Sequence, residues 1–425
     1  MTLRLGKRAR LWLVAGGTVA LLAAGGGVAV AAKAGSGDDG GAGKQGIGAA
    51  TAGKGADRTA PPGKKPKPGQ SPTGGPTAAP TTVPPTTPPA TDQDNVRIPM
   101  PGYEPYFYSG DVVVDAAHGK VYLTAGKNTK DVVATDLDGG NPRTVAQVDG
   151  GAGMTLSPDG SKLYVAASAG SWVSVIDTTT YETTGLWIGK TDGTDTCPRD
   201  VALAAGLLWV AWGCDNAPAG VGRIDLETRQ YELNVTVGDG STRNLVSSPA
   251  LLATVPGEPN TLLVGETDAN PAPLYRFEIS DNMLVLDATG STDGGSVRQL
   301  AVTPDGSGVI VPSGAPYYHQ VFRTSDLTLA GRYQTTSYPN AVAIRDDGLV
   351  VAGIDGSYED DLWIFEPGGT EPILTYDFGH LPNQTTWAHH LQDGALAVHG
   401  NRAYALTDQL SEPGMLTLRI RELPA

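Results

Sequence analysis

The fold is decided by the stretch MTLSPDGSKLYVAASAGSWVSVID at residues 154–177. Its apolar start, Met154-Thr155-Leu156, runs into the tight turn Ser157-Pro158-Asp159-Gly160. Proline presets the φ angle that a type I turn needs early, and glycine closes such a turn without steric cost. Two further apolar runs follow, residues 162–166 and 172–177. The stretch therefore predicts three short antiparallel strands joined by tight turns.

The same unit recurs along the chain. The turn returns as Pro304-Asp305-Gly306 and as Asp346-Asp347-Gly348, each before an apolar triplet. Counting weaker copies, the triplets centre on residues 122, 164, 209, 263, 310, 351 and 404, about 47 residues apart, and propeller blades of four strands have this period. Independent immunoglobulin-like sandwiches need about 100 residues each and fit this spacing poorly. The sequence predicts an all-β, seven-bladed β-propeller of four-stranded blades over residues 96–425.

The last repeat is too short to form a complete blade. After His399 the chain has room for about two more strands, the second at residues 415–421. We expect residues 95–100 to supply the missing outer strand, because joining the two ends of the domain closes the ring and removes a sheet edge.

The repeats also resemble a known family. Residues 157–166, followed by 173–177, are similar to the YVTN-type repeat of YncE-like bacterial β-propellers, and residues 111–144 are similar to the YWTD-type repeat. The resemblance covers most of residues 108–425 and implies a propeller. Propellers of this kind include binding proteins, lactonases and quinoprotein relatives, so the resemblance implies no single activity. No catalytic signature of these enzymes can be carried over to this chain.

The N-terminal residues predict export. Residues 1–10 form a basic tail without acids, and residues 11–32 contain no charged side chain. A helix of that length spans about 33 Å, enough to cross a membrane. The basic flank should stay cytoplasmic. Small residues at 29–34 also fit a signal-peptide cleavage site, so a transmembrane helix and a cleaved signal peptide both remain open. Either alternative makes the rest of the chain extracytoplasmic, anchored to the cell membrane or secreted.

A linker follows at residues 33–95. Its first part is rich in glycine and alanine, and residues 61–90 hold many prolines interleaved with threonine. Such a composition cannot bury a core, so we expect a disordered, proline-rich stalk. The whole chain carries a formal net charge of −15, and the negative charge is concentrated after the stalk. An acidic domain argues against nucleic-acid binding, which needs a basic face.

The only two cysteines, Cys197 and Cys214, flank a predicted hairpin whose strands are 201–205 and 207–212. Pairing across that turn places the cysteines opposite each other, at about the separation that a disulfide requires. In an exported chain we expect them to form one disulfide. Closing this loop is worth about 3 kcal/mol in the chain-entropy description. A reactive redox pair is the alternative.

The remaining candidate site residues are histidines and aromatics. His389 and His390 are adjacent and should face opposite sides of a strand, and nothing completes a metal-ligand spacing, so we predict no metal and no cofactor. We keep only His390 as a pocket candidate. Aromatic side chains in inter-strand loops suit sugar or peptide recognition, although packing between blades explains each of them equally well. The predicted binding residues are Tyr106, Tyr108, Tyr317, Tyr358, Trp387 and His390.

Three functions are compatible with these features. The first is a membrane-tethered, extracytoplasmic binding module without enzymatic activity, whose ligand is a protein, a peptide or a cell-wall glycan. The second is an exported lactonase- or lyase-like enzyme with its pocket at the central channel. Titratable groups converging on that channel, such as His390 with an acid from another blade, would favour the enzyme. A third alternative is a scaffold in an envelope assembly.

Overall fold

The computed structural model describes residues 95–105, 109–215, 218–235, 246, 248–356, 359–379, 389–409 and 411–425. They belong to one compact unit, Thr81–Ala425. None of these residues forms a helix with the length and apolar character needed to cross a membrane. The segment predicted at residues 11–32 and the stalk up to residue 94 lie outside the described residues.

The described residues form seven four-stranded antiparallel sheets and one short hairpin. The first sheet contains β2 (Val112–Asp115), β3 (Lys120–Leu123), β4 (Asp131–Asp136) and β5 (Arg143–Gln147), and the second β6 (Gly151–Leu156), β7 (Lys162–Ala167), β8 (Trp172–Asp177) and β9 (Thr183–Trp187). The hairpin of β10 (Lys190–Thr191) and β11 (Thr194–Asp195) precedes the third sheet, which contains β12 (Pro198–Ala204), β13 (Leu207–Gly213), β14 (Ala219–Asp225) and β15 (Tyr231–Glu232). The fourth contains β16 (Ala250–Val255), β17 (Glu258–Glu266), β18 (Pro273–Ser280) and β19 (Met283–Ser291), and the fifth β20 (Ala301–Val302), β21 (Gly308–Val311), β22 (Tyr318–Arg323) and β23 (Leu329–Gln334). The sixth contains β24 (Pro339–Ile344), β25 (Val350–Ile354), β26 (Leu362–Phe365) and β27 (Leu374–Tyr376), and the seventh β28 (His390–His399), β29 (Arg402–Asp408), β30 (Met415–Glu422) and β1 (Asn95–Pro99).

The tight turns form as the sequence predicts. In the second sheet Gly160 has a φ of 70° and its N–H donates to the carbonyl oxygen of Ser157 at 2.8 Å. Asp159 accepts hydrogen bonds from the hydroxyls of Ser157 and Ser161. The fifth sheet repeats this arrangement around Asp305. The acids in these turns therefore stabilise the connections between strands.

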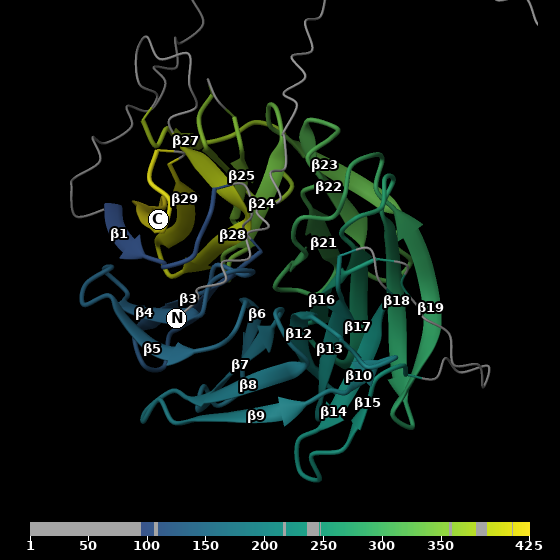
Figure 1. The fold of residues 1–425 in the computed structure, drawn as a ribbon. Coiled ribbons are helices and arrows are strands. Elements are labelled where there is room, and N and C mark those ends of the chain that lie inside the picture. The colour runs from purple at the N-terminus through teal and green to yellow at the C-terminus, as the bar shows by residue number, and fades with distance from the viewer. Residues whose placement is uncertain are drawn as a thin grey trace, which may run out of the picture. The chain divides into compact units, whose positions relative to one another are not determined.

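The core is divided among the interfaces between neighbouring sheets. Seven clusters of buried apolar side chains occur, and each draws its members from two adjacent sheets. Tyr122 and Leu163, for example, join the first and second sheets, while Tyr404 and Val121 join the seventh and the first. The sheets thus pack in a closed ring, as Figure 1 shows. The predicted seven-bladed propeller with four-stranded blades is confirmed.

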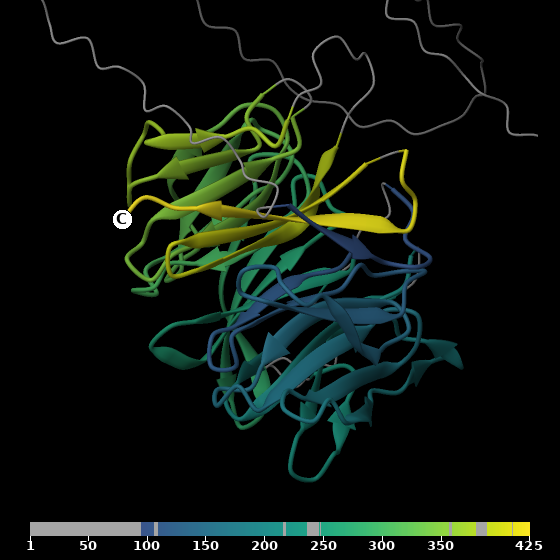
Figure 2. The same cartoon turned by 90° about the vertical axis from the view of Figure 1, so that its left-hand side faces the viewer.

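The N-terminal strand closes this ring. β1 pairs with β30 over five residue pairs, from Asn95 opposite Arg419 to Pro99 opposite Met415. Ile98 is fully buried in the cluster between the seventh and first sheets. In Figure 2 the blue N-terminal strands lie directly beside the yellow C-terminal ones. The predicted closure by residues 95–100 is confirmed.

Candidate binding site in the central channel

A cavity of about 730 Å³ occupies the central channel. Each sheet begins with its innermost strand, and most of the cavity wall comes from those strands or the residues just before them. The contributing segments are residues 109–111 before β2, parts of β6, β12 and β16, residues 297–302 around β20, and Asp393 and Gly394 of β28. The up-and-down order of the strands places the starts of the inner strands and the connections from second to third strands on one face. We call this side of the propeller the entry face.

Two carboxylic acids on the wall join neighbouring sheets. Asp111 accepts hydrogen bonds from the N–H of Val112 at 2.7 Å and, across the interface, from the N–H of Met154 at 2.8 Å. Asp200 repeats this geometry two sheets further on. It accepts from the N–H of Val201 at 2.8 Å and from the N–H of Leu252 at 2.7 Å. Both oxygens of each carboxyl group are thus held by backbone amides.

Gly153 makes room for this arrangement. A Cβ atom at this position would lie 2.3 Å from Oδ1 of Asp200 and 2.9 Å from the carbonyl oxygen of Arg199. Only glycine, which has no Cβ, lets β6 and β12 approach so closely. The Asp200 carboxyl group of the third sheet therefore lies directly against the backbone of Gly153 in the second sheet.

The surroundings shift the protonation of these two acids. Burial, together with the nearby charge of Asp200, raises the pKa of Asp111 to about 8, although two backbone hydrogen bonds oppose the shift. Burial likewise raises the pKa of Asp200 to about 7. A carboxyl group removed from bulk water favours its neutral form, because the charged form loses solvation. At neutral pH Asp111 therefore keeps its proton for most of the time.

The fifth sheet makes the equivalent connection without an acid. Gln299 accepts a hydrogen bond from the N–H of Val342 at 2.7 Å through its side-chain oxygen. Its side-chain amide donates to the carbonyl oxygen of Leu396 at 3.2 Å. The bond between neighbouring sheets therefore needs an acceptor oxygen but no ionisable group.

A pair of oppositely charged residues, Arg298 and Asp393, also lines the cavity. The pairing of β28 with β29 is interrupted between Leu391 and Leu396, and the intervening Asp393 and Gly394 reach the cavity. Nη1 of Arg298 lies 2.6 Å from Oδ2 of Asp393. Burial raises the pKa of Asp393, and the charge of Arg298 opposes this shift. The side chain still exposes 42% of its surface, because it faces the open cavity.

The predicted disulfide lies beside the channel. Cys197 and Cys214 are bonded, with their Cα atoms 5.1 Å apart. A bulge between Pro198 and Asp200 shifts the pairing by one residue, so that the carbonyl oxygen of Cys197 accepts from the N–H of Gly213. The two cysteines are therefore neighbours across the hairpin but not strictly opposite.

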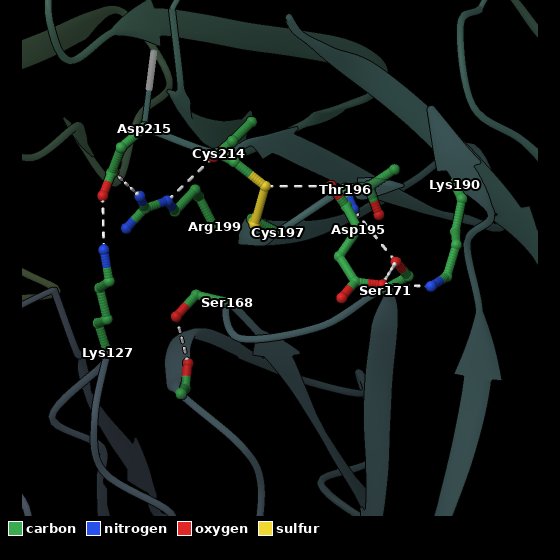
Figure 3. The surroundings of a disulfide bond; sticks show 12 residues. Lys127, Ser168, Ser171, Lys190, Asp195, Thr196, Cys197, Arg199, Cys214 and Asp215 are labelled. Carbon is green, nitrogen blue, oxygen red and sulfur yellow. Dashed lines mark hydrogen bonds and ion pairs between the residues drawn. A yellow bond between two sulfur atoms is a disulfide. The ribbon is translucent and has the colours of Figure 1, made fainter. Parts of the chain in front are cut away.

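The disulfide fixes the segment that carries Asp215. Oδ1 of this carboxylate lies 2.6 Å from Nη2 of Arg199, and Oδ2 lies 2.6 Å from Nζ of Lys127, which belongs to the first sheet (Figure 3). The three side chains form an ion-paired bridge from the first to the third sheet. The bridge is exposed to solvent, so its contribution to stability is small.

His390 is buried beside the channel. Its Nδ1 lies 3.0 Å from Oδ1 of Asp355, an acid of the sixth sheet, so His390 meets an acid from another blade. Burial alone would lower the pKa of His390, but the hydrogen bond and charge of Asp355 raise it overall. Nε2 of His389, the residue directly before β28, lies 2.8 Å from a different acid, Asp361, so the two adjacent histidines meet different acids. His390 is not among the residues of the cavity wall.

Close to His390 a hydrogen-bond network reaches the N-terminal segment. The hydroxyl group of Tyr103, which follows β1, lies 2.7 Å from Oδ2 of Asp408 and 3.0 Å from Oε1 of Gln392. This network attaches the closing segment to the seventh sheet. We assign it a structural role.

One predicted aromatic residue is described. Tyr317 lies in the connection between β21 and β22 and exposes 50% of its surface. Its ring centroid lies 5.7 Å from that of Tyr338, which is also 50% exposed and immediately precedes β24. Both positions belong to the entry face. Tyr106, Tyr108, Tyr358 and Trp387 lie outside the described residues, so their assignment to a binding surface stays a prediction.

The polar residues of the channel wall are not among the site residues predicted from the sequence. Asp111 stands directly before β2 and Asp200 lies near the start of β12, and in the sequence each is simply an acid followed by a valine. A polar residue at or near the start of several inner strands was the available signal. It could have identified Asp111, Asp200 and Gln299.

Comparisons with known proteins place the chain by fold alone. No protein-family model matches it, and no curated protein matches its sequence. Among solved structures, a chain of the mitotic checkpoint complex is similar at 14% identity and a TM-score of 0.58, over 82% of this chain and 98% of that one. The Cps50 (Swd1) β-propeller domain of Myceliophteria thermophila is similar at 15% identity and a TM-score of 0.53, over 75% and 97%. A chain of Kuenenia stuttgartiensis hydrazine synthase is similar at 13% identity and a TM-score of 0.56, over 76% and 96%. The chain thus shares the β-propeller fold with these proteins, while its resemblance to the YVTN-type family stays a prediction.

Proposed function

We propose that the protein is a membrane-tethered, extracytoplasmic binding module whose ligand, a protein, a peptide or a cell-wall glycan, docks on the entry face. One observation carries the proposal. The charged mouth of the channel and the exposed pair Tyr317 and Tyr338 share this face. Exposed tyrosines beside polar groups supply both contact area and hydrogen bonds. β-Propellers commonly act as interaction modules, and binding residues concentrate on loops held by a rigid scaffold.

The proposed location rests on the sequence. The uncharged residues 11–32 follow a basic tail, and the stalk at residues 33–95 provides the reach that a tethered domain needs. A disulfide between Cys197 and Cys214 suits an oxidising compartment outside the cytoplasm. Protease added to cells with an opened wall should cleave the propeller without lysis. Protection of the propeller until the membrane is broken would contradict this location.

The docking face can be tested with paired variants. In the full chain, Tyr317→Ala with Tyr338→Ala should reduce capture of purified cell-wall glycan and of chemically cross-linked envelope proteins at least about tenfold. Leu329→Ala is the matched control, because Leu329 is 46% exposed on the outer strand β23 of the same sheet as Tyr317. Equal capture by both variants would show that the ligand does not dock on the entry face.

The lactonase- or lyase-like enzyme is the second candidate, and one observation favours it. The pKa values of Asp111 and Asp200 are raised to about 8 and about 7, which is the range of a general acid at neutral pH. Their bonds to backbone amides also explain both residues as structural, and we therefore rank binding first. Hydrolysis or elimination on a panel of lactones and uronic-acid glycans, lost in Asp111→Asn, would reverse this order.

A further inference from the structure

We propose that the central channel binds a lysine or arginine side chain of a peptide partner, with its cationic group between Asp111 and Asp200. The inference rests on the proposed function and names the chemistry of the ligand.

The charged side chains on the cavity wall are mostly acidic. The wall contains five acids and two arginines. The arginines are already engaged, Arg199 with Asp215 and Arg298 with Asp393, each at 2.6 Å. Asp111 and Asp200 have no cationic partner within the part of the chain that the structure describes. The channel therefore offers two carboxyl groups whose charged form a cationic ligand can stabilise.

The bonds between neighbouring sheets do not require charged groups at these positions. Gln299 forms the equivalent bond between sheets with a neutral amide, so an acceptor oxygen is sufficient. Two acids in one channel also repel each other, and the charge of Asp200 helps to raise the pKa of Asp111. A bound cation would relieve this repulsion. Ligand binding and ionisation of the two carboxyl groups are therefore coupled.

The cavity wall next to the two acids carries small side chains. On the entry side of the two acids the cavity is lined by the small residues Ser109, Gly110 and Ala250. These residues leave space for an aliphatic stem next to the two acids. Lysine and arginine combine such a stem with a terminal charge.

An organic cation fits the site better than a metal ion. Both oxygens of Asp111 and of Asp200 already accept from backbone amides. In the described parts of the chain no group of three histidine, cysteine, aspartate or glutamate side chains is placed to hold a metal ion. An ammonium or guanidinium group donates its own hydrogen bonds and needs no such set.

The test is a calorimetric titration of the full chain at pH 8. The two probes are a capped tripeptide with lysine between two glycines and the same tripeptide with norleucine, which has a similar stem without charge. The lysine probe should bind at least about tenfold more tightly than the norleucine probe. At pH 7, where Asp111 holds its proton, binding of the lysine probe should release protons. Equal binding of both probes, or binding of neither, overturns the proposal.

Variants of the two acids test whether the lysine probe binds in the channel. Asp111→Asn and Asp200→Asn should each weaken binding of the lysine probe about tenfold and leave the norleucine probe unchanged. Asp192→Asn is the matched control, because Asp192 is exposed in the β10–β11 hairpin and has a φ of 51° that asparagine adopts readily. An unchanged affinity in both channel variants overturns the proposal. If either variant fails to fold, the wild-type comparison of the two probes and the proton release still decide it.

Failure of this inference is distinguishable from failure of the proposed function. If the lysine probe does not bind, while the variant with Tyr317→Ala and Tyr338→Ala still loses ligand capture, the entry face remains the docking surface and the channel ligand is not cationic.

Discussion

Gly153 and Asp200 lie so close that the strands carrying them tolerate no side chain at residue 153. A Cβ atom there would approach Oδ1 of Asp200 to 2.3 Å. Through this contact the carboxyl group of Asp200, in the third sheet, packs against the inner strand of the second sheet.

Gly153→Ala should therefore destabilise the propeller. The added methyl group would displace Asp200 and break its bond to Leu252, at a cost of about 1–3 kcal/mol in the free energy of unfolding. Gly331→Ala is the control, because a Cβ atom at this exposed position of β23 would meet nothing within 4 Å. Urea unfolding of both variants measures the difference. Similar midpoints would show that β6 and β12 can separate without cost.

The stability of the domain should depend on the ionisation of Asp111. Its folded-state pKa is raised from 3.8 to about 8, so the folded state holds a proton that the unfolded state loses above pH 4. The contribution of Asp111 is therefore complete below pH 4 and is lost as the pH rises to about 8. Urea unfolding at pH 5, 6, 7 and 8 should show a decline that Asp111→Asn reduces and that Asp192→Asn leaves intact. Parallel curves for all three proteins would contradict the prediction.

Removal of the disulfide should lower stability without changing the fold. Cys197→Ala with Cys214→Ala frees the loop that the bond closes, and about 2–4 kcal/mol of unfolding free energy should be lost. Thermal unfolding with and without reductant provides the same comparison on the wild-type chain. Free thiols at both positions in a mass measurement of the unreduced protein would disprove the bond.

Closure of the ring should depend on Ile98. Its side chain is fully buried between the seventh and first sheets, so Ile98→Ala should cost about 2–5 kcal/mol. The neighbouring Arg97 is exposed on the same strand, and Arg97→Ala should change stability little. A comparison of their urea midpoints is the measurement. Equal midpoints would show that the packing of β1 on the seventh sheet does not contribute to the stability of the ring.

The fold could be predicted because it repeats locally. The turn at Pro158-Asp159-Gly160 and the triplet around Tyr164 carry their own conformational preferences, so a period of about 47 residues emerged even where single copies were weak. The copy around Leu263 matches the repeat least well, yet Val255 pairs with Glu258 across a turn at Pro256-Gly257, and β17 forms over Glu258–Glu266. Tertiary packing against the neighbouring sheets completes what the local sequence indicates weakly.

The candidate site could be predicted only in part. The disulfide followed from a hairpin, which is a local feature. The channel wall, in contrast, exists only where inner strands from distant parts of the sequence meet. Asp111 and Asp200 are 89 positions apart, and only the assembled ring brings their charges together. The exposure of Tyr338 likewise depends on how β24 enters the ring.

The position of β1 has a mechanical consequence. A pull on the chain ahead of Asn95 would load β1 before any other strand, and five residue pairs with β30 would resist it. Oδ1 of Asn95 also accepts from Nη1 of Arg419 at 3.0 Å and from Nη2 of Arg421 at 3.2 Å, which reinforces the point of loading. If β1 peeled away, the seventh and first sheets would lose the strand that joins them, and the cluster around Ile98 would meet water. The strand that completes the ring is thus also the place where tension on the chain would open it.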